Sequence, residues 1–560
     1  MTTDAIQKDH KWLNTIGFQE IPGYTDGYAY QGELVCKSIP VPIQLSFPDL
    51  NFIELPKIHL LRPRPEELQK PLAHVDQLGE LCYLDKESYR ADRYDPSKTI
   101  ATYLAKAKEV LEDSIIEKNT HEVGYELQSY WVTPYRGITL TNDKTIKTAY
   151  YNLVEYETPI GTLLKRYVIG SKPEIESFIA SHNGKNKYKD HEHAIWIRLN
   201  SNALLPVEDK DWPPIHPKAI FHWLKEVDQG AAHRLQWILG TKDGAHNPLL
   251  IAFRSQHNSM VGTEIYLPKK MVSSAKQAGQ FKKLFMSDTG RFGTKTHRII
   301  IDNLSEKYQI TRNLKGANLA NRKIVLIGCG TIGGYLARLM VQAGAGQEKG
   351  KLTLCDADDF RSGNVGRHYL DSRYLYVNKA NACRHKLLSE YTGANIKALG
   401  HEYSSLMQDI NTDIIIDATG HESFSELLNE ESISLHKKNR KCPPLLYSWI
   451  DGGGNCVRSL YYDGKGGCYR CLRNAQGEER FKPIRDPSSA PSVKYQCGES
   501  YTPYPASVSV HAAGLALDAL LDWAQKNPAP RFRNIALSPE AIQHKNQNLT
   551  ALKHCPACQN

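Results

Sequence analysis

The sequence predicts a multidomain α/β protein, and three observations support this prediction. The chain has 560 residues, too many for one ordinary core, so about three or four domains are expected. Its first part contains three strand-like segments and then an amphipathic helix, whereas its last part alternates strands with helices, which is typical of a mostly parallel sheet. Hydrophobic residues make up 41% of the chain, as in a globular protein.

An N-terminal α+β domain is expected over residues 1–118. Its predicted strands cover residues 28–38, 41–47 and 58–61. Asp95 and Pro96 form a typical helix start, and apolar residues then recur at helical spacing at Ile100, Leu104, Ala107 and Leu111. Between the last strand and this helix, Cys82 follows a turn in the segment Asp76-Gln77-Leu78-Gly79-Glu80-Leu81. Its thiol is a candidate acyl carrier.

A central domain is expected over residues 119–310, and it contains no chemical motif. The pattern of residues predicts one helix and several strands. The helix covers 217–227, and the strands cover 148–157, 162–169, 194–199, 249–253 and 262–267. A linker or docking role between two active ends is the simplest interpretation.

The C-terminal domain, residues 311–560, begins with a nucleotide-binding pattern. An apolar strand at 324–327 runs into Gly328-Cys329-Gly330-Thr331-Ile332-Gly333, which opens a helix at 333–343. In such a loop one glycine forms the tight turn, one lets the backbone approach phosphate and one lets the helix pack closely, while the N–H groups at the helix start hold the anion. A strand at 351–355, a helix at 378–390 and a strand at 413–417 complete a Rossmann-like pattern.

Polar residues after the second strand of this domain favour ATP over a nicotinamide cofactor. Asp356 and Asp358 lie where a ribose-binding acid belongs. Asn364, Arg367 and Lys379 follow, and an amide with two cations beside a phosphate site suits a triphosphate whose α-phosphorus is to be attacked.

Four of the twelve cysteines form two CxxC pairs, Cys468 with Cys471 and Cys555 with Cys558. Four thiolates suit a closed, structural zinc site, and the presence of two pairs makes a redox CxxC the weaker alternative. Cys497 lies apart from both pairs, in a polar stretch before a helix at 508–523, and is a candidate thioester-forming nucleophile.

The composition limits the partners that the chain is expected to bind. The net charge of +9 comes from lysines and arginines scattered among acids, so no direct nucleic-acid binding is expected. The N-terminus has no signal-peptide pattern, and no apolar run approaches the length that crosses a bilayer. A cytoplasmic protein with no membrane partner is therefore expected.

The motifs of residues 311–560 resemble those of ThiF-type adenylyltransferases, the superfamily of ubiquitin-activating enzymes. The resemblance implies that the glycine loop and Asp356 bind ATP, with Asn364, Arg367 and Lys379 on the phosphates. Members of this family often have the structural zinc site. Many also carry a magnesium-binding aspartate three residues after the position of Asp417, where this chain has Gly420. The candidate magnesium ligands here are Asp417, Asp358 and Glu422.

The segment from Asp76 to Cys82 resembles the active-site turn of ubiquitin-conjugating enzymes, over roughly residues 10–118. The His-Pro-Asn triplet that usually precedes the cysteine is missing, and His74 stands near the place of the asparagine. His74 could donate a hydrogen bond to an oxyanion, or it could simply be satisfied within its loop.

Taken together, the chain resembles the fused activating and conjugating enzymes of bacterial anti-phage CBASS systems. The resemblance implies a homodimer that uses ATP and magnesium to adenylate the C-terminus of a cGAS-like nucleotidyltransferase. Cys497 would then take the acyl group, Cys82 would receive it, and a target lysine would form the amide. A sulfur-carrier type of ThiF enzyme with an unrelated N-terminal domain is the first alternative. A nicotinamide-dependent dehydrogenase and a non-catalytic nucleotide-binding scaffold are further ones.

Overall fold

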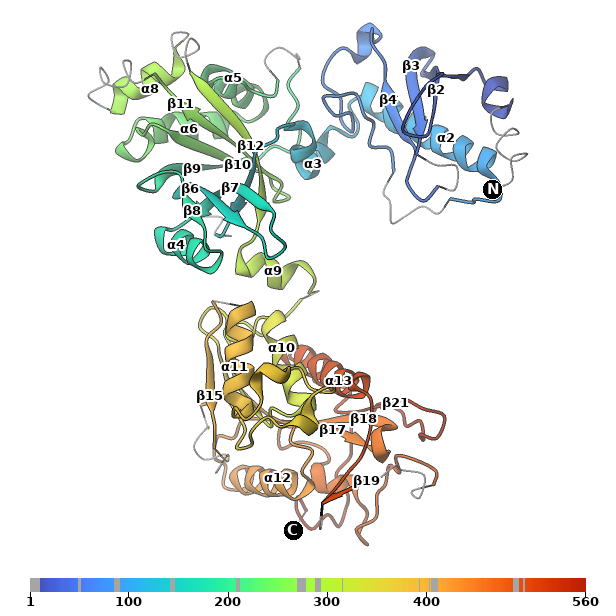
Figure 1. Cartoon of the computed structure of the whole chain (residues 1–560), viewed down its shortest axis with the longest axis vertical. Coiled ribbons are helices and arrows are strands. Elements are labelled where there is room, and N and C mark those ends of the chain that lie inside the picture. Colours follow the sequence, from blue (N-terminus) through green and yellow to red (C-terminus); the bar gives the residue numbers. More distant parts are fainter. Residues whose placement is uncertain are drawn as a thin grey trace. The chain divides into compact units, whose positions relative to one another are not determined.

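Figure 1 shows the computed structural model of the chain, whose contacts divide it into two compact units, Met1–Ser305 and Glu306–Asn560. The predicted domain limits at residues 118 and 310 stay predictions. The structure describes residues 11–48, 52–84, 91–141, 147–207, 212–268, 278–287, 294–314, 316–391, 393–401, 403, 411–486, 493–496 and 499–559.

The N-terminal part of the first unit is an antiparallel sheet covered by one helix. Its strands pair in chain order: β1 (Gln19–Glu20), β2 (Tyr28–Cys36), β3 (Ile39–Phe47) and β4 (Lys57–Leu60). Helix α2 (Pro96–Ile115) begins where predicted, because the Asp95 carboxylate accepts a hydrogen bond from the backbone N–H of Lys98 and Pro96 occupies the first turn. The buried face of α2 packs on apolar residues of β2 and β3 in one core.

The rest of the first unit is a closed β-barrel. The strands follow the order β7-β5-β12-β11-β10-β9-β6, and β6 pairs again with β7, which closes the ring. The two-residue strand β8 adds to β6 outside the ring. The bounds are β5 (Arg136–Thr139), β6 (Thr148–Glu157), β7 (Leu163–Gly170), β8 (Lys185–Asn186), β9 (Glu192–Arg198), β10 (Leu249–Arg254), β11 (Met260–Tyr266) and β12 (Lys295–Asn303).

The two faces of the barrel strands have separate cores, as the alternation of side chains along a strand requires. One core is formed inside the ring by residues such as Tyr151, Tyr167 and Ala252. The opposite face carries Ile195, Ile251 and other residues that pack against helices. The helices of this part are α3 (Val123–Tyr130), α4 (Lys172–Ser181), α5 (Pro217–Val227), α6 (Gln229–Leu239) and α8 (Ala278–Met286). The predicted strand 148–157 and helix 217–227 are confirmed residue for residue.

The second unit is built on a mixed sheet with the order β15-β14-β13-β16-β17-β18-β21. The first five strands are parallel, and β18 and β21 are antiparallel to their neighbours. The chain moves outward from β13 to β14 and β15, then returns to β16 on the other side of β13. Ligands of such sheets bind at this switch point, outside the carboxyl ends of the strands. The bounds are β13 (Lys323–Ile327), β14 (Lys351–Cys355), β15 (Ile396–Leu399), β16 (Ile414–Asp417), β17 (Leu445–Asp451), β18 (Cys456–Tyr462) and β21 (Phe532–Ala536).

Helices cover both faces of this sheet. Residues of α10, α11 and α13 share one core with Leu326 and Leu354, whereas residues of α12 share the other core with Val325 and Ile415. The helices of this unit are α9 (Glu306–Arg312), α10 (Thr331–Gln342), α11 (Lys379–Glu390), α12 (Glu422–Lys437) and α13 (Ala506–Ala524). Among the residues described, no helix combines the length and the apolar character that a membrane crossing requires.

Candidate functional site

The glycine loop between β13 and α10 has the tight geometry that its sequence predicts. Gly328 has a φ of +87°, and a Cβ there would lie 2.8 Å from backbone atoms of Ala418 and Thr419. A Cβ on Gly333 would lie 1.8 Å from the carbonyl oxygen of Gly328, so only glycine lets the helix begin this close to the strand. Around Gly330, which caps α10, the space is open. Phosphate can therefore approach the backbone at this residue.

Asp356 ties the end of β14 to this loop. Its carboxylate accepts hydrogen bonds from the backbone N–H of Cys329 at 2.7 Å and from that of Asp358 at 2.8 Å. Burial raises the pKa of Asp356, although these two hydrogen bonds oppose the shift. Lys379, the first residue of α11, forms an ion pair of 2.8 Å with Asp358. One cation and two carboxylates thus meet at the carboxyl edge of the sheet.

A cavity of about 930 Å³ opens at this edge. It reaches from the glycine loop to the ends of β14, β16 and β17, and the size suits a nucleotide. Its lining includes the predicted residues Gly328, Gly330, Asp356, Asp358 and Lys379.

The structure does not bring Asn364 and Arg367 into the lining of this cavity. The side-chain oxygen of Asn364 accepts a hydrogen bond from the backbone N–H of Arg361. The Arg367 guanidinium stacks on Tyr504 at 4.8 Å and donates to the carbonyl of Thr502 at 3.2 Å. The predicted phosphate contacts of these two residues stay predictions.

Of the three candidate magnesium ligands, Asp358 is the one that lines the large cavity with an exposed carboxylate. Both oxygens of the buried Asp417 are engaged: one accepts from the Ser425 hydroxyl at 2.5 Å, the other from the Thr419 hydroxyl at 2.7 Å. Glu422 pairs with Arg473 in a neighbouring cavity. The donor set therefore fits a hard cation best at Asp358.

Cys497 lies outside the described residues. The strands on either side of it, β19 (Val493–Gln496) and β20 (Glu499–Tyr501), pair as an antiparallel hairpin that leads into α13. Tyr504, shortly after this hairpin, lines the large cavity and contacts the hydroxyl of Thr331 at 3.2 Å.

The four cysteines of the two CxxC pairs meet in one cluster beneath α12. The sulfur of Cys468 lies 3.8 Å from those of Cys471 and Cys555, and the Cys471 sulfur lies 3.6 Å from that of Cys558. Tetrahedral zinc with bonds of about 2.3 Å holds its sulfur ligands about 3.8 Å apart, whereas a disulfide needs about 2 Å. The donor set and its spacing fit zinc.

Cys82 is exposed at the end of its turn. Its backbone N–H donates to the carbonyl of His74 at 2.7 Å, and one carboxylate oxygen of Asp76 accepts from the N–H groups of Leu78 and Glu80. Gly79 has a φ of +92°, which a side chain rarely adopts. The turn thus presents the thiol to solvent on a backbone fixed by hydrogen bonds.

His74 lies beside Cys82 between two carboxylates of the following segment. Its Nε2 is 2.9 Å from Glu122 and its Nδ1 is 3.1 Å from Glu126. Burial alone would lower the pKa of His74, but hydrogen bonds with the Cys82 and Glu126 side chains and the charges of both glutamates outweigh it and raise the pKa to about 10. His74 is therefore an imidazolium ion at neutral pH, and both ring nitrogens are engaged.

Sequence reasoning missed Glu122 and Glu126 because both lie beyond the predicted end of the first domain. Their spacing of four residues places both on one face of a helix, which is the signal that could have found them. It also missed His368, whose Nε2 donates to the carbonyl of Cys329 at 2.8 Å behind the glycine loop. Burial lowers the pKa of His368 to about 4, so the ring is neutral and can accept from the N–H of Leu370.

Two family models match the chain, in the two places where the geometry above is found. The ThiF family matches residues 305–557, and prokaryotic E2 family B matches residues 16–135. The second match includes Cys82, His74, Glu122 and Glu126.

Relatives of similar length align over most of the chain. An ATP-dependent ubiquitin transferase-like protein Cap2 of Pseudomonas aeruginosa is 29% identical over 534 residues, which are 93% of this chain and 92% of the relative. A protein of the same name from Vibrio cholerae is 26% identical and covers 84% of this chain and 83% of its own length.

Among solved structures, E. coli MccB with ATP aligns with 20% identity over 43% of this chain and 67% of its own, with a TM-score of 0.32. The two family matches and the relatives that align over most of the chain agree with the geometry. The chain is an enzyme in which a prokaryotic E2 family B domain is followed by a ThiF family domain.

Proposed function

We propose that the chain uses ATP to adenylate the C-terminal carboxylate of a protein, carries the acyl group on two cysteines in turn and joins it to an amine. The observation that carries this proposal is the presence on one chain of a nucleotide-sized cavity lined by Lys379 and a glycine loop, and of an exposed thiol beside an imidazolium ion. Either feature could occur in a protein without the other. When both are present on one chain, the cavity can activate an acyl group with ATP and the thiol can carry it.

The adenylation step would use the carboxyl edge of the sheet. The N–H groups of the glycine loop and the Lys379 ammonium would hold the phosphates, and Asp356 would keep the loop in place. Asn364 and Arg367 would join the phosphates after Arg367 leaves Tyr504. Magnesium, when bound, would neutralise charge on the triphosphate, and Asp358 is the residue we assign to it, in place of Asp417 or Glu422. The substrate carboxylate attacks the α-phosphorus, pyrophosphate leaves, and an acyl adenylate forms.

The thioester steps follow from thiol chemistry. The Cys497 thiolate attacks the acyl carbon and releases AMP, and the Cys82 thiolate then displaces the Cys497 sulfur. The zinc that Cys468, Cys471, Cys555 and Cys558 would hold is structural, because all four of its positions are filled by protein.

The last step needs a group that accepts a proton from the attacking amine. A carboxylate oxygen of Glu126 lies within 4.8 Å of the Cys82 sulfur, and His74 holds that carboxylate. Glu126 would take one proton from the incoming ammonium group. The amine then attacks, the C–N bond forms, the C–S bond breaks, and the second proton goes to the Cys82 sulfur.

The biological setting that we propose is CBASS anti-phage defence in the cytoplasm, with a cGAS-like nucleotidyltransferase as the activated protein, lysines of other proteins as targets and a homodimer as the working form. The similarity to proteins named ATP-dependent ubiquitin transferase-like supports an ATP-dependent conjugation of this kind.

The test is a non-reducing gel of the full chain with ATP, magnesium and the proteins of the neighbouring operon, where we expect the cGAS-like nucleotidyltransferase to be encoded. We expect two thiol-sensitive adducts on the wild-type chain. Cys82→Ala should keep the adduct on Cys497, and Cys497→Ala should lose both adducts while ATP–pyrophosphate exchange continues. A Cys442→Ala variant, which changes a partly buried cysteine outside the proposed relay, should behave like wild type.

A sulfur-carrier enzyme would give another result. Its turnover would not depend on Cys82, so full activity of Cys82→Ala would contradict the proposal. Absence of exchange with every protein that ends in glycine would contradict adenylation itself.

A further inference from the structure

A second cavity adjoins the nucleotide cavity, and its chemistry differs from that of a phosphate site. It encloses about 210 Å³ beside the ends of β16 and β17. Gly420, Ile450 and Asp451 line both cavities, so the two are neighbours across these residues. A chain that places its C-terminus at the nucleotide can therefore place an earlier residue in the second cavity.

Aromatic rings form much of the wall of this cavity. Tyr447 and Tyr469 lie with their ring centroids 4.7 Å apart, and Trp449 meets Tyr469 edge-on at 5.8 Å. Phe481 also lines the cavity. Aromatic faces attract cations, and such walls are a common means of binding an ammonium or guanidinium group.

The charged lining is predominantly acidic. Five carboxylates and two guanidinium groups line the cavity: Asp417, Glu422, Glu426, Asp451 and Glu479, with Arg458 and Arg473. The formal balance is therefore three negative charges.

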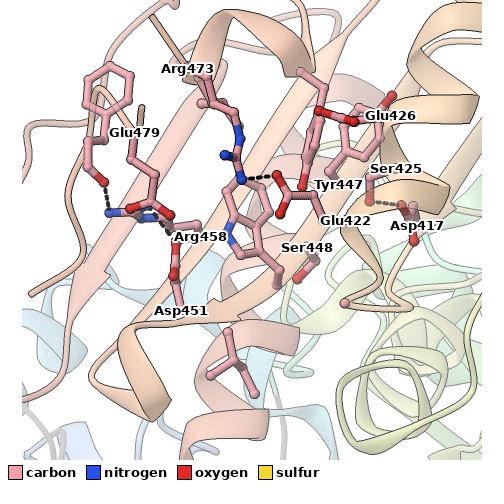
Figure 2. Close-up of a pocket in the computed structure, with 16 residues that line it drawn as sticks. Asp417, Glu422, Ser425, Glu426, Tyr447, Ser448, Asp451, Arg458, Arg473 and Glu479 are labelled. Atoms are coloured by element: carbon pink, nitrogen blue, oxygen red, sulfur yellow. Dashed lines mark hydrogen bonds and ion pairs between the residues drawn. The ribbon is translucent and has the colours of Figure 1, made fainter. Parts of the chain in front are cut away.

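The two arginines leave part of the acidic lining without a partner (Figure 2). Arg458 pairs with Asp451 at 2.7 Å and also donates to the backbone of Phe481, so it is part of the wall. Arg473 reaches Glu422. Within the described part of the chain, neither Glu426 nor Glu479 forms an ion pair. Burial, together with the nearby charge of Asp451, raises the pKa of Glu479, and the charges of Arg458 and Arg473 only partly oppose this shift.

The hydroxyl of Tyr447 supplies an independent indication of a ligand. Tyr447 is 1% exposed, it lines this cavity, and its oxygen has no hydrogen-bond partner among the residues that the structure describes. A buried hydroxyl without a partner costs about 1–3 kcal/mol, and a ligand with N–H groups would remove that cost.

The arrangement suits an organic cation better than a metal ion. Within the described residues, the groups whose ligand atoms converge to within 4.8 Å are the four cysteines and the trio His74, Cys82 and Glu126, and no set from this cavity is among them. Carboxylates spread around aromatic walls fit a larger, more diffuse charge. The Arg473 guanidinium beside Glu422 is already a cation of that kind.

From these observations we infer that this cavity binds a lysine or arginine side chain of the activated protein, placed shortly before its terminal carboxylate. The side chain lies along Trp449 and donates to the Tyr447 hydroxyl, and the carboxylates of Glu426 and Glu479 at the two ends of the cavity attract its charge. The inference rests on the proposed adenylation of a protein C-terminus and adds a rule for which C-termini are accepted.

The test compares short synthetic peptides that end in glycine and carry lysine, glutamine or glutamate at one position before it. The readout is ATP–pyrophosphate exchange by the full chain. At one position we expect lysine to lower KM about tenfold relative to glutamine and glutamate to raise it. In the double variant Glu426→Gln with Glu479→Gln, the lysine preference should fall to within about twofold.

Two further variants test whether a change in the preference comes from a general loss of structure. Glu430→Gln, one turn further along α12 at an exposed position outside the cavity, should keep the full preference. Tyr447→Phe should reduce the preference about threefold without lowering the melting temperature, since the lost hydroxyl has no protein partner among the described residues.

If the KM for exchange is the same for lysine, glutamine and glutamate at every peptide position, the inference is wrong, although the proposed adenylation is still supported. An unchanged preference for lysine in the double glutamine variant would also overturn it, because another part of the protein would then bind the charged side chain. No exchange with any peptide or with the proteins of the neighbouring operon would instead refute the proposed function, and the inference with it.

Discussion

At the residue scale, the most informative arrangement is the one around Cys82. His74 has a φ of +61°, and its backbone N–H donates to the Tyr130 hydroxyl at 2.6 Å. The loop is therefore fixed on both the backbone and the ring side, with the imidazolium held by Glu122 and Glu126. We read His74 as a positioning residue and Glu126, within 4.8 Å of the reacting sulfur, as the proton acceptor.

Replacing Glu126 with glutamine should slow amide formation and spare thioester formation. The variant keeps the shape of the side chain but removes the proton acceptor, and general bases of this kind contribute about a hundredfold or more. We expect the discharge of the Cys82 thioester to lysine to slow by about that factor in single-turnover assays. The amount of thioester formed should not change.

Two other glutamates provide matched controls for this experiment. Glu109→Gln changes an exposed residue of α2 that pairs with Lys106, and its discharge rate should equal that of wild type. Glu122→Gln should have a smaller effect than Glu126→Gln, because Glu122 holds the far side of the ring. Equal effects of Glu122→Gln and Glu126→Gln would argue that both act only by holding His74.

The ion pairs of His74 also predict a pH dependence of stability. The pKa of His74 is about 10 in the folded chain and 6.5 in its reference state, so the folded state binds the proton more tightly. This contribution is fully present below pH 6.5 and is lost as the pH rises towards 10. The melting temperature of wild type should therefore exceed that of His74→Gln most below pH 6.5, and the difference should shrink steadily up to pH 10. A difference that grows with pH would contradict the assignment of the charged ring.

At the element scale, two glycines of the loop between β13 and α10 are expected to have different roles, Gly333 in folding and Gly330 in ATP binding. Gly333→Ala places a methyl group against the Gly328 carbonyl and should cost about 2–3 kcal/mol of folding free energy. Gly330→Ala meets open space and should cost less than about 1 kcal/mol, yet weaken ATP binding because the methyl group lies where phosphate approaches. Thermal melting and ATP titration measure the two effects.

Gly514→Ala, in the interior of α13, is the control for this pair. A Cβ there meets nothing within 4 Å, so helix propensity should stabilise the chain by about 0.5–1 kcal/mol. If Gly333→Ala melted like Gly514→Ala, the close approach of α10 to β13 would be wrong.

The cysteine cluster beneath α12 leads us to predict that the protein contains zinc. Its sulfur atoms have the spacing of a tetrahedral zinc site, so we expect one zinc ion per chain by elemental analysis. Cys471→Ser should lose that ion and lower the melting temperature, because metal binding and folding are coupled in such sites. Cys383→Ser, at a buried cysteine outside the cluster, should retain the zinc. Full zinc content in Cys471→Ser would rule the cluster out as the site.

The elements that the sequence predicted are those with strong local patterns. The glycine loop, the α2 start at Asp95 and the strand at 148–157 follow from hydrophobic periodicity and capping residues, which act between neighbours in the chain. The closure of the barrel depends on pairing between β6 and β7 together with the order of five other strands, and alternation alone is the same in an open sheet. The acidic cavity could not be predicted because Tyr447, Glu426 and Glu479 come from three separate segments that only the fold brings together.

At the scale of the whole molecule, the division after Ser305 predicts that the second unit, Glu306–Asn560, folds independently. Residues 306–560 contain the complete mixed sheet, both of its cores and the cysteine cluster. Expressed alone, they should unfold in one cooperative transition and support ATP–pyrophosphate exchange at a rate within about twofold of the full chain carrying Cys82→Ala. An insoluble or inactive fragment would show that the N-terminal unit is needed for folding.

The ring of strands in the first unit restricts how other proteins can attach to it. A sheet with a free border offers unpaired N–H and C=O groups, along which an extended peptide can add as one more strand. Here the border strands β6 and β7 are hydrogen-bonded to each other, and in the described part of the chain only the two-residue β8 extends beyond the ring. Along the closed part of the ring, a partner of this domain must therefore contact side chains or helices, and the backbone there cannot pair with that of a second copy.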